Sequence, residues 1–391
     1  MSSKYEQRGV SATKSEVHEA IKGLDKGLFP KAFCKVLPDV AGGDAEWCNI
    51  MHADTAGTKT SLAYLYWKET GDLSVWEGIV QDSLVMNLDD MGCVGAVNNI
   101  LISSTIGRNK NRIPGEVLTT IIRGAEKFKD RMAEQGVGLH LTGGETADVG
   151  DIVRTIYVGY TTFARLRRDK LVVNNIKPGN VIVGLASYGQ STYEEEYNGG
   201  MGSNGLTSAR HDVFRHDYAG KYPESFDPEV PRSVIYTGSR SLTEQVDIGN
   251  GKTMAAGKLV LSPTRTYLPV LKVLLDELYP KIAGLIHCTG GAQTKVVKFI
   301  DNVRVVKDNL FTPPPLFDLI REESGTDWRE LYQVFNMGHR LEVYLPENEA
   351  QTVLDIAARF GIVAQVVGFV EEGDKPSVRL HTPGGVEDYF E

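Results

Sequence analysis

Residues 54–59 read DTAGTK, which places an acid, a glycine and a lysine in one short loop after the apolar run EWCNIMHA (46–53). A P-loop ends in Gly-Lys-Ser/Thr, but Thr58 stands directly before Lys59 here, so the Walker spacing is broken. Lys59 falls at the start of a predicted helix, where a cation is unfavourable. A lysine there indicates that an anion is expected, and Lys59 could bind a phosphate as a point charge. We expect Lys59→Ala to lower turnover more than stability.

Three acids share a setting that suits a metal site. Asp54, Asp90 and Glu145 each end an apolar element beside a glycine-containing loop. In an α/β domain such ends gather at one edge, so the sequence predicts that the three carboxylates converge. Loop carboxylates are the usual Mg²⁺ ligands in phosphoryl-transfer sites, where the metal also binds substrate phosphates. The alternative is that each acid only caps a helix or turn. With Lys59 and two Thr-Gly pairs beside them, we favour a site.

A Thr-Gly-Gly sequence occurs twice, in LHLTGG (139–144) and in IHCTGG (286–291). Both stretches read as a strand, then Thr-Gly-Gly, then the start of a helix. Such a turn lets backbone N–H groups and a helix N-terminus face an anion. Six residues are too few to demonstrate an internal duplication. They do predict that both halves of the chain use the same anion-facing turn.

The stretch GMGSNG (200–205) formally matches G-x-G-x-x-G. A Rossmann fingerprint follows a buried strand, whereas this stretch follows the acidic run YEEEYN. We interpret it as a flexible loop before a helix that begins at Leu206. Ser203 or Asn204 would act there as the helix cap or as a ligand.

The elements that would position these residues form two α/β domains. Pro114 opens a long amphipathic helix that ends before Gly136, which stands where a left-handed cap is expected. A turn at KPGN (177–180) precedes the strand VIVGLAS, and we place the domain boundary there. A chain of 391 residues suits two domains. We expect an N-terminal α/β domain over residues 1–170 and a C-terminal α/β domain over residues 177–391.

The composition is that of an ordinary globular protein, with 41% hydrophobic and 24% charged residues and a net charge of −9. The negative charge argues against a nucleic-acid partner, because that binding needs clustered cations. The polar N-terminus MSSKYEQRGV carries no signal peptide, and no apolar run approaches the roughly 20 residues of a membrane span. The four cysteines lack the C-x-x-C spacing of a zinc site. These observations predict a cytoplasmic enzyme with reduced thiols and no membrane partner.

Taken together, these motifs resemble the phosphoribosylformylglycinamidine cyclo-ligase family, also called aminoimidazole ribonucleotide synthetase. DTAGTK is similar to the family's Asp-Gly-Val-Gly-Thr-Lys, LDDMGCVGA to its Val-Asn-Asp segment, and GGETAD to its Gly-Gly-Glu-Thr-Ala-Glu. GSNGLTSAR, SPTRTYLPVL, HCTGG and FNMG resemble its later motifs. The resemblance runs through most of the chain. The order of Gly-Gly-Glu followed by Phe-Asn-Met-Gly is specific to this family.

The resemblance implies an ATP-dependent ligase of purine biosynthesis that forms a C–N bond, uses Mg²⁺ and a phosphoribosyl substrate, and forms a homodimer through the sheets of its N-terminal domains. The formyl amide oxygen would be phosphorylated, and the amidine nitrogen would then close the imidazole ring. The residues implicated are Asp54, Lys59, Asp90 and Glu145 for catalysis, with Asp54, Asp90 and Glu145 as metal ligands; Gly57, Thr58, Lys59, Gly143 and Gly144 for ATP and its phosphates; and Ser203, Asn204, Thr289, Gly290 and Gly291 for the substrate.

The chain departs from the family pattern in ways that leave alternatives open. The family's His before Ser-Asn-Gly is Gly202 here, and an insertion at about residues 193–200 precedes it. That insertion is either a lid, in which Tyr193 and Tyr197 replace the missing His, or an acidic surface loop. Rival functions are another ATP-dependent member of the superfamily, similar to selenophosphate synthetase or thiamine-monophosphate kinase, and a catalytically silent homologue.

Overall fold

The protein is described by a computed structural model over residues 4–10 and 15–390, and the first three residues of the polar N-terminus lie outside this part. The earlier elements are α1 (Lys4–Gln7), α2 (Ser15–Ala20), β1 (Val36–Pro38), β2 (Trp47–Thr55), α3 (Lys59–Thr70), α4 (Ser74–Gly92), β3 (Ile100–Arg108), α5 (Gly115–Glu134), β4 (Leu139–Asp148), β5 (Ile156–Arg167) and η1 (Arg168–Lys170). The later elements are β6 (Asn180–Ala186), α6 (Leu206–Val213), α7 (Asp217–Lys221), η2 (Pro223–Ser225), η3 (Arg232–Val234), β7 (Gln245–Gly249), β8 (Lys252–Ala255), α8 (Ala256–Val260), α9 (Leu268–Leu278), η4 (Tyr279–Lys281), β9 (Gly284–His287), η5 (Ala292–Phe299), β10 (Val303–Lys307), α10 (Pro315–Ser324), α11 (Trp328–Val334), β11 (His339–Pro346), η6 (Glu347–Glu349), α12 (Ala350–Arg359), β12 (Ala364–Glu372), β13 (Ser377–Thr382) and β14 (Gly385–Phe390).

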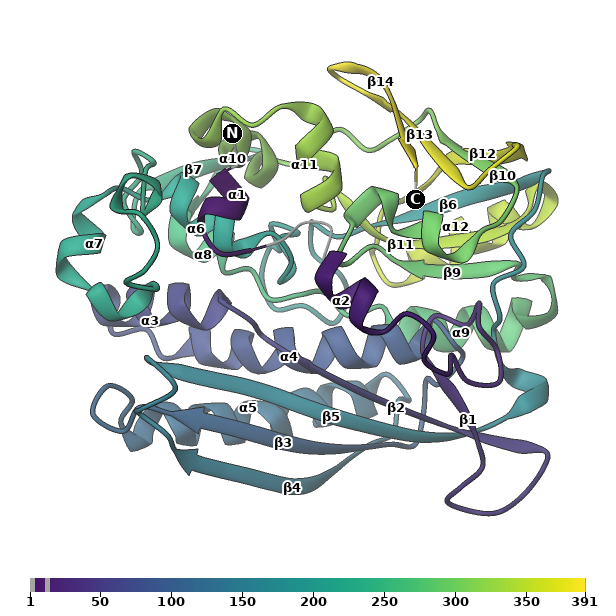
Figure 1. The fold of residues 1–391 in the computed structure, drawn as a ribbon, viewed down its shortest axis with the longest axis horizontal. Helices are drawn as coiled ribbons and strands as arrows, with labels where there is room; N and C mark the ends of the chain where they lie inside the picture. The colour runs from purple at the N-terminus through teal and green to yellow at the C-terminus, as the bar shows by residue number, and fades with distance from the viewer. Residues whose placement is uncertain (1–3, 11–14, 391) are drawn as a thin grey trace.

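Within the described residues the strands form two larger sheets, which lie in separate parts of the molecule (Figure 1). The first sheet has the order β1-β2-β5-β3-β4, the second has the order β14-β13-β10-β12-β6-β11-β9, and β7 pairs with β8 in a small ribbon. This arrangement confirms the mixed α/β architecture with two sheet-containing units. The expected boundary, between residues 170 and 177, falls in the segment that connects β5 to β6.

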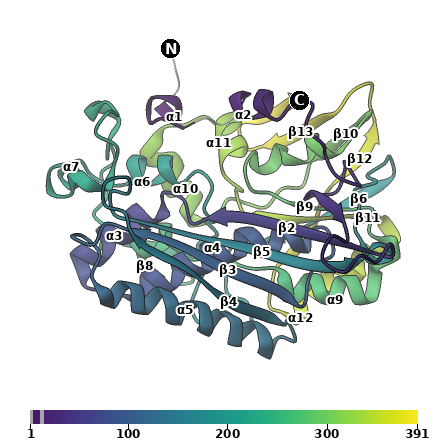
Figure 2. The same cartoon turned by 60° about the horizontal axis from the view of Figure 1, so that its bottom comes forward.

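Helices α4 and α5 cover one face of the first sheet (Figure 1 and Figure 2). The expected helix between Pro114 and Gly136 is confirmed as α5, and Val117, Ile121 and Phe128 are buried on its inner side because they recur at helical spacing. Helix α4 differs, since it is buried along nearly its whole length between the first sheet and α9 of the second unit. Asp82, Asp89 and Asp90 of α4 are therefore held inside the protein.

The second sheet positions polar residues in the interior. Helices α9 and α12 pack together, with α12 against β6 and β12, while η5 packs against β9 and β13. Strand β11 lies between β6 and β9, and every residue from His339 to Leu345 is buried. Charged side chains on β11 must therefore find partners within the protein. Across the described part of the chain, no helix combines the length and apolar composition that a membrane crossing needs.

The first Thr-Gly-Gly sequence does not form the expected turn and helix start. Strand β4 continues through it, because a bulge next to Ser104 absorbs the two glycines by shifting the register with β3. Gly143 has a φ of +87°, and an ideal Cβ on Gly144 would lie 2.1 Å from the Ser104 carbonyl oxygen. Only glycine fits these positions. Glu145 consequently lies within a strand and not in a loop.

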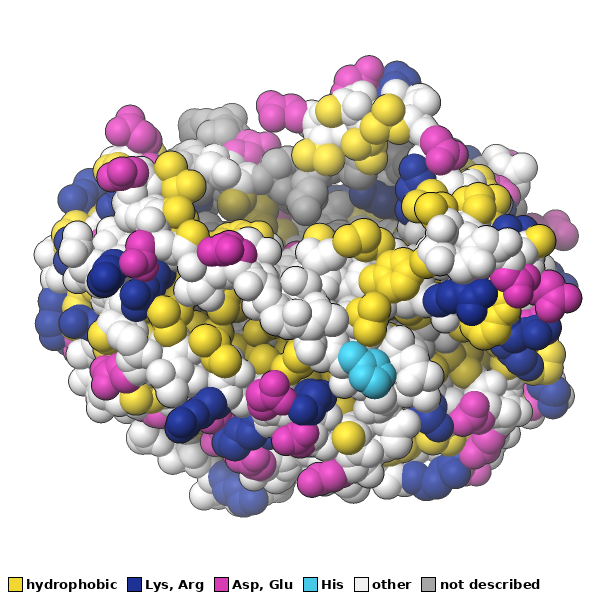
Figure 3. Space-filling view, turned by 90° about the horizontal axis from the view of Figure 1, so that it is seen from below, with side chains coloured by type: hydrophobic (Ala, Val, Ile, Leu, Met, Phe, Trp, Pro, Cys, Tyr) yellow, Lys and Arg dark blue, Asp and Glu magenta, His cyan; other side chains and the backbone are white. Residues whose placement is uncertain are grey.

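The opposite face of the first sheet is open. Paired residues on β2, β5, β3 and β4 form a row across it, made of Met51, Phe163, Leu101 and His140. Met51 is 64% exposed and Leu101 is 43% exposed. Figure 3 views the molecule from below and shows mostly hydrophobic and uncharged side chains in the middle, with charged ones toward the margins. This is an unusually apolar face for solvent, and it suits contact with another surface.

Candidate functional site

The two units meet at a chain of polar side chains built on α4, β9 and β11. Asp90 lies in the last turn of α4, His287 ends β9, and Arg340 lies on β11. His287 Nδ1 is 2.7 Å from Asp90 Oδ1, and Arg340 Nε is 3.0 Å from His287 Nε2. All three residues are buried. A guanidinium N–H can only donate, so His287 accepts at Nε2 and donates its Nδ1–H to Asp90.

Asp90 is held in its ionised form. Burial by itself would raise the pKa of Asp90, but hydrogen bonds with His287 and His52 outweigh burial and hold the pKa well below its usual range. A carboxylate in the last turn of a helix faces the negative end of the helix dipole, so these partners are needed there. Asp90 is therefore an anion at neutral pH that can hold a cation.

His52 extends this chain toward the end of β2. Its Nε2 lies 3.4 Å from Asp90 Oδ2, and its Nδ1 lies 3.0 Å from Asn87 Oδ1. Burial lowers the pKa of His52, but Asp90, Asn87 and Asp54 together raise it above the usual value. Asp54 is two residues further along β2 and so shares the strand face of His52. Asp90 thus contacts this imidazole, and the charge of Asp54 acts on it as well.

The third expected acid lies apart from these two. The register across β2, β5, β3 and β4 places Glu145 in the row of Thr55, on the face opposite to that of Asp54. Three strand spacings, about 14 Å, separate β4 from β2. Gly143 and Gly144 also lie on β4. Within one chain the three carboxylates do not converge as the sequence predicts, because the bulge continues β4 where a loop at the sheet edge was expected.

Lys59 is the first residue of α3 and is completely buried. Its Nζ donates to Asp82 Oδ1 at 2.8 Å, to the Ser262 carbonyl at 2.6 Å and to the Gly202 carbonyl at 3.1 Å. These acceptors take up all three N–H bonds of the ammonium. The expected direct contact between Lys59 and a phosphate does not fit this arrangement. Lys59 instead ties α3 to two segments of the second unit.

The remainder of the DTAGTK loop is open on its backbone side. Gly57 has a φ of +58°, and an ideal Cβ on it would meet nothing within 4 Å. Thr58 stands at the N-cap of α3 without a capping bond, because its Oγ1 lies 2.7 Å from Oγ1 of Thr207 on α6. Thr58 therefore joins this loop to the helix that follows Ser203 and Asn204.

The second Thr-Gly-Gly sequence forms the predicted turn and is followed by η5. Gly291 lies in the left-handed region, with a φ of +92°, directly before the first residue of η5. An ideal Cβ on Gly290 would have only one atom within 4 Å, Nδ2 of Asn204 at 3.8 Å. The loop that carries Ser203 and the turn that carries Thr289 are thus neighbours. The structure brings together the residues that the sequence assigns to the substrate.

The acidic insertion at 193–200 is anchored in the protein. Tyr193 is buried and donates its hydroxyl hydrogen to the Thr266 carbonyl at 2.6 Å. Glu194 accepts a hydrogen bond from the Arg265 guanidinium, also at 2.6 Å. Neither the lid nor the acidic surface loop describes this segment, because its first two residues are fixed by buried partners in the SPTRTY stretch. The insertion therefore packs against the SPTRTY stretch through Tyr193 and Glu194.

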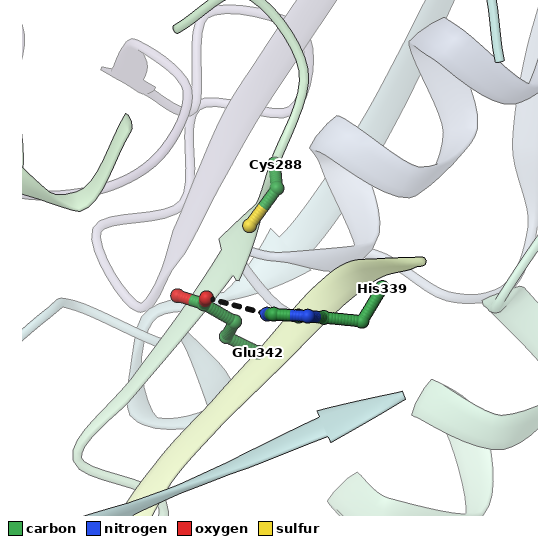
Figure 4. Close-up of side chains that lie close together, drawn as sticks. All are labelled: Cys288, His339 and Glu342. Atoms are coloured by element: carbon green, nitrogen blue, oxygen red, sulfur yellow. Dashed lines mark hydrogen bonds and ion pairs between the residues drawn. The ribbon is translucent and has the colours of Figure 1, made fainter. Parts of the chain in front are cut away.

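Figure 4 shows a second buried cluster, in which Cys288, His339 and Glu342 bring their possible ligand atoms within 4.8 Å of one another. Lys307 pairs with Glu342, and the Tyr344 hydroxyl donates to the same carboxylate at 2.7 Å. Burial opposes ionisation of Glu342, but Lys307 and His339 lower its pKa to about 2. Burial raises the pKa of the Cys288 thiol well above its usual value. A metal ion would have to displace Lys307 and ionise this thiol, so the cluster is an ion-pair network.

Five polar residues at or beside the junction of the two units carried no assignment from sequence, namely His52, Asp82, His287, Lys295 and Arg340. Of these, His287 contacts Asp90 across the junction, and Asp82 accepts a hydrogen bond from Thr264 across it. Asp82 did carry a signal, because with Asp89 it forms an i,i+7 pair of acids on an otherwise apolar helix. His287 belongs to the IHCTGG motif, two residues before Thr289, which the sequence assigns to the substrate. His52 and Arg340 carry no local signal, since their partners come from distant segments.

Two family profiles match the chain. One, described as AIR synthase related protein, N-terminal domain, matches residues 35–165. The other, described as AIR synthase related protein, C-terminal domain, matches residues 232–381. Together the two matches cover more than half of the chain.

Relatives with a known name are similar over most of the chain. The phosphoribosylformylglycinamidine cyclo-ligase of Methanocaldococcus jannaschii is 28% identical, over 82% of this chain and 77% of the relative. The protein of the same name from Methanococcus maripaludis strain C7 is 27% identical, over 93% of this chain and 86% of the relative. That from Alkaliphilus metalliredigens is 25% identical, over 96% and 97%.

Solved structures share the fold at low identity. PurL of T. maritima in complex with FGAR is 15% identical with a TM-score of 0.53, covering 97% of this chain and 49% of PurL, so the chain spans about half the length of that protein. The hydrogenase maturation protein HypE in complex with ATP is 15% identical with a TM-score of 0.53, covering 95% of this chain and 93% of HypE. At this identity the likeness shows the fold alone.

Proposed function

Because the chain belongs to the AIR synthase related family, we propose that it is an ATP-dependent cyclo-ligase of purine biosynthesis that converts formylglycinamidine ribonucleotide and ATP to aminoimidazole ribonucleotide, ADP and phosphate. Relatives of that name, similar over most of the chain, support the proposal. The observation that carries it is the contact between Asp90 and His287. This contact joins an anion of the first unit to the strand that leads into the Thr289–Gly291 turn.

The proposed reaction turns an amide oxygen into a leaving group. The formyl amide oxygen attacks the γ-phosphorus of ATP, an O–P bond forms, and ADP leaves. The amidine nitrogen then attacks the activated carbon, the C–O bond breaks, and phosphate and a proton are released as the ring closes. Dividing the reaction in this way replaces one hard step by two easier ones. Arg340, fixed by His287, supplies a buried positive charge that stabilises the charge moving onto the phosphoryl group.

Asp54 and Asp90 suit a Mg²⁺ ion. Magnesium in proteins is held by one or two carboxylates together with substrate phosphates, and it keeps several waters. Asp90 lies 3.4 Å from His52, and Asp54 shares the strand face of His52, so a site with two protein ligands fits. When bound, the ion would neutralise charge on the ATP phosphates. Gly57 and Thr58 remain the proposed ATP contacts, because the backbone of this loop is open to approach.

We further propose a homodimer that forms through the open face of the first sheet. The exposed row that contains Met51 and Leu101 supports this, because it offers the same apolar surface on both copies. Glu145 lies on this face, with Gly143 and Gly144 on the same strand. In a homodimer these residues would act at the interface, which accounts for their distance from Asp54 in one chain. An ATP-using biosynthetic enzyme of this kind would work in the cytoplasm.

One experiment separates the proposal from its two rivals. The protein is incubated with ATP and Mg²⁺ and, in parallel, with formylglycinamidine ribonucleotide, thiamine monophosphate or selenide, while ADP is followed. The proposal predicts ADP release above background only with the ribonucleotide. Release with another acceptor would identify a kinase-like member of the superfamily. The absence of release with any acceptor would support the catalytically silent homologue.

A further inference from the structure

A half-buried lysine that the proposed mechanism does not use faces the junction of the two units. Lys295 lies on η5, and its Nζ donates to Thr289 Oγ1 at 3.0 Å and lies 5.2 Å from the centroid of the Phe33 ring. Its charge helps to hold the carboxylate of Asp90 ionised. Among the described residues, no carboxylate comes within the 4.0 Å of an ion pair with Lys295. The positive charge of Lys295 is therefore not neutralised by direct contact with an acid of the described chain.

Further donors near this ammonium also lack partners. Ser203 Oγ is buried and makes no hydrogen bond, and the half-buried side chain of Asn204 lies beside the turn. The backbone N–H groups of Gly290 and Gly291 are equally unused by described residues. Arg340 is only 2% exposed, and its Nη1 has no partner. Unpaired buried polar groups are rare in folded proteins, so the presence of two of them, Ser203 Oγ and Arg340 Nη1, indicates that a ligand completes them.

The space at this turn matches such a ligand. Gly290 does not have a positive φ, so its backbone conformation does not require glycine. The space where its Cβ would lie has only one neighbouring atom, Nδ2 of Asn204 at 3.8 Å. Each of the groups there can donate a hydrogen bond: the backbone amides, the Ser203 hydroxyl, the Asn204 amide and the Lys295 ammonium, which has N–H bonds beyond the one that it gives to Thr289. Donors without acceptors select an anion, and a compact tetrahedral anion can take hydrogen bonds from several directions. Phe33, whose ring centroid lies 5.2 Å from Lys295 Nζ, also lines a neighbouring hollow of about 610 Å³.

We propose that Lys295 is the residue that recognises a phosphate monoester at this turn, together with the Thr289–Gly291 backbone and the loop of Ser203 and Asn204. This rests on the proposed function, in which the substrate carries a ribose phosphate. The phosphates of ATP are the other possible source of the same chemistry. Lys295 contributes as a point charge, because its ammonium can reorient toward a phosphate oxygen without a fixed fork geometry. Selectivity for a dianion over a neutral ribose follows from this charge.

The test measures binding and not turnover. Ribose 5-phosphate is titrated into the full-length protein and followed by ³¹P NMR, and a non-hydrolysable ATP analogue with Mg²⁺ is titrated separately by calorimetry. Lys295→Met should weaken ribose 5-phosphate binding about 10- to 100-fold and leave the ATP analogue unchanged. Lys298→Met, which removes an exposed lysine from the same element, should leave both affinities unchanged.

A second variant separates ligand binding from folding. Gly290→Ala places a methyl group in the open space of the turn, so it should keep the melting temperature of the wild type and lose ribose 5-phosphate binding. The inference is overturned if the wild type does not bind ribose 5-phosphate, if Lys295→Met binds it normally, or if only the ATP analogue is lost. Formation of aminoimidazole ribonucleotide by the wild type is scored independently. If the protein binds ribose 5-phosphate through Lys295 but makes no product, the proposed function is wrong and this inference is still supported.

Discussion

His287 and Asp90 are 197 residues apart in the chain, yet His287 Nδ1 lies 2.7 Å from Asp90 Oδ1. The contact joins the end of β9 to the last turn of α4, so it forms only when the two units are assembled. Arg340 on the other side of the imidazole fixes which nitrogen carries the proton. A site built in this way depends on residues that no single motif contains.

We predict that Arg340→Met slows turnover about 100- to 1,000-fold, the usual cost of losing a group that stabilises developing charge. The variant also removes the donor to His287 Nε2, so the imidazole can change tautomer. Turnover at saturating substrates measures the first effect, and the ¹⁵N chemical shifts of His287 measure the second. Arg329→Met, at an exposed ion pair with Glu387, is the control. Wild-type turnover with an unchanged tautomer would contradict the role of Arg340.

We predict that Lys59→Ala lowers the free energy of unfolding by about 3 to 5 kcal/mol, because it leaves the buried Asp82 carboxylate without its counter-charge. This reverses the expectation from sequence that turnover would change more than stability. Urea unfolding measures the effect, with Lys68→Ala on the exposed side of the same helix as the control. The Lys59→Met, Asp82→Asn double variant should recover part of the loss. An unchanged unfolding midpoint in Lys59→Ala would show that the ammonium is not in this pair.

We predict that Glu342→Gln lowers the free energy of unfolding at neutral pH by about 3 kcal/mol. The folded pKa of Glu342, about 2, lies below its ordinary value of 4.5 because Lys307 and His339 outweigh burial. The stability from Glu342 is therefore fully present above pH 4.5 and is lost as the pH falls toward 2. The gap between wild type and variant, measured by urea unfolding, should shrink over that range. Glu371→Gln, at an exposed pair, should show only a small gap, and a pH-independent gap for Glu342→Gln would refute the account.

The parts of the fold that depend on local pattern could be predicted from the sequence. Helix α5 was predictable because its apolar residues recur at helical spacing and Gly136 ends it. The turn before η5 was predictable because Gly290 and Gly291 require little beyond their own backbone freedom. The same Thr-Gly-Gly pattern predicted a turn at Gly143, and that prediction was wrong because a register shift against β3 allows the strand to continue. That shift depends on a neighbouring strand and leaves no mark in the local sequence.

The candidate site could be predicted only in part, for a related reason. Asp54 and Asp90 were proposed as site residues because each follows an apolar run near a glycine. Their connection through His52 was not visible, because a histidine on a strand most often reads as an ordinary core or surface residue. Lys59 was placed on the correct helix end, but its three acceptors come from α4 and from two distant loops. Contacts between segments far apart in the chain decided what these side chains do.

We predict that the protein is a dimer in solution and that Leu101→Glu makes it a monomer. Leu101 is 43% exposed in the row across the open face of the first sheet, and two charges brought together there would repel. Sedimentation velocity measures the mass. Ile122→Glu, at a 54% exposed position on the helix side of the same unit, should remain dimeric. A monomeric wild type, or a dimer that survives Leu101→Glu, would place the interface elsewhere or remove it.

The most direct measurement of the proposed function is the ratio of ADP to aminoimidazole ribonucleotide formed in one reaction. The protein is supplied with ATP, Mg²⁺ and formylglycinamidine ribonucleotide, with a parallel reaction that lacks the ribonucleotide. We predict that ADP and aminoimidazole ribonucleotide appear in equal amounts, and that ADP release falls to background without the ribonucleotide. Equal ADP release in both reactions, or ADP without the imidazole product, would contradict the assignment of a cyclo-ligase.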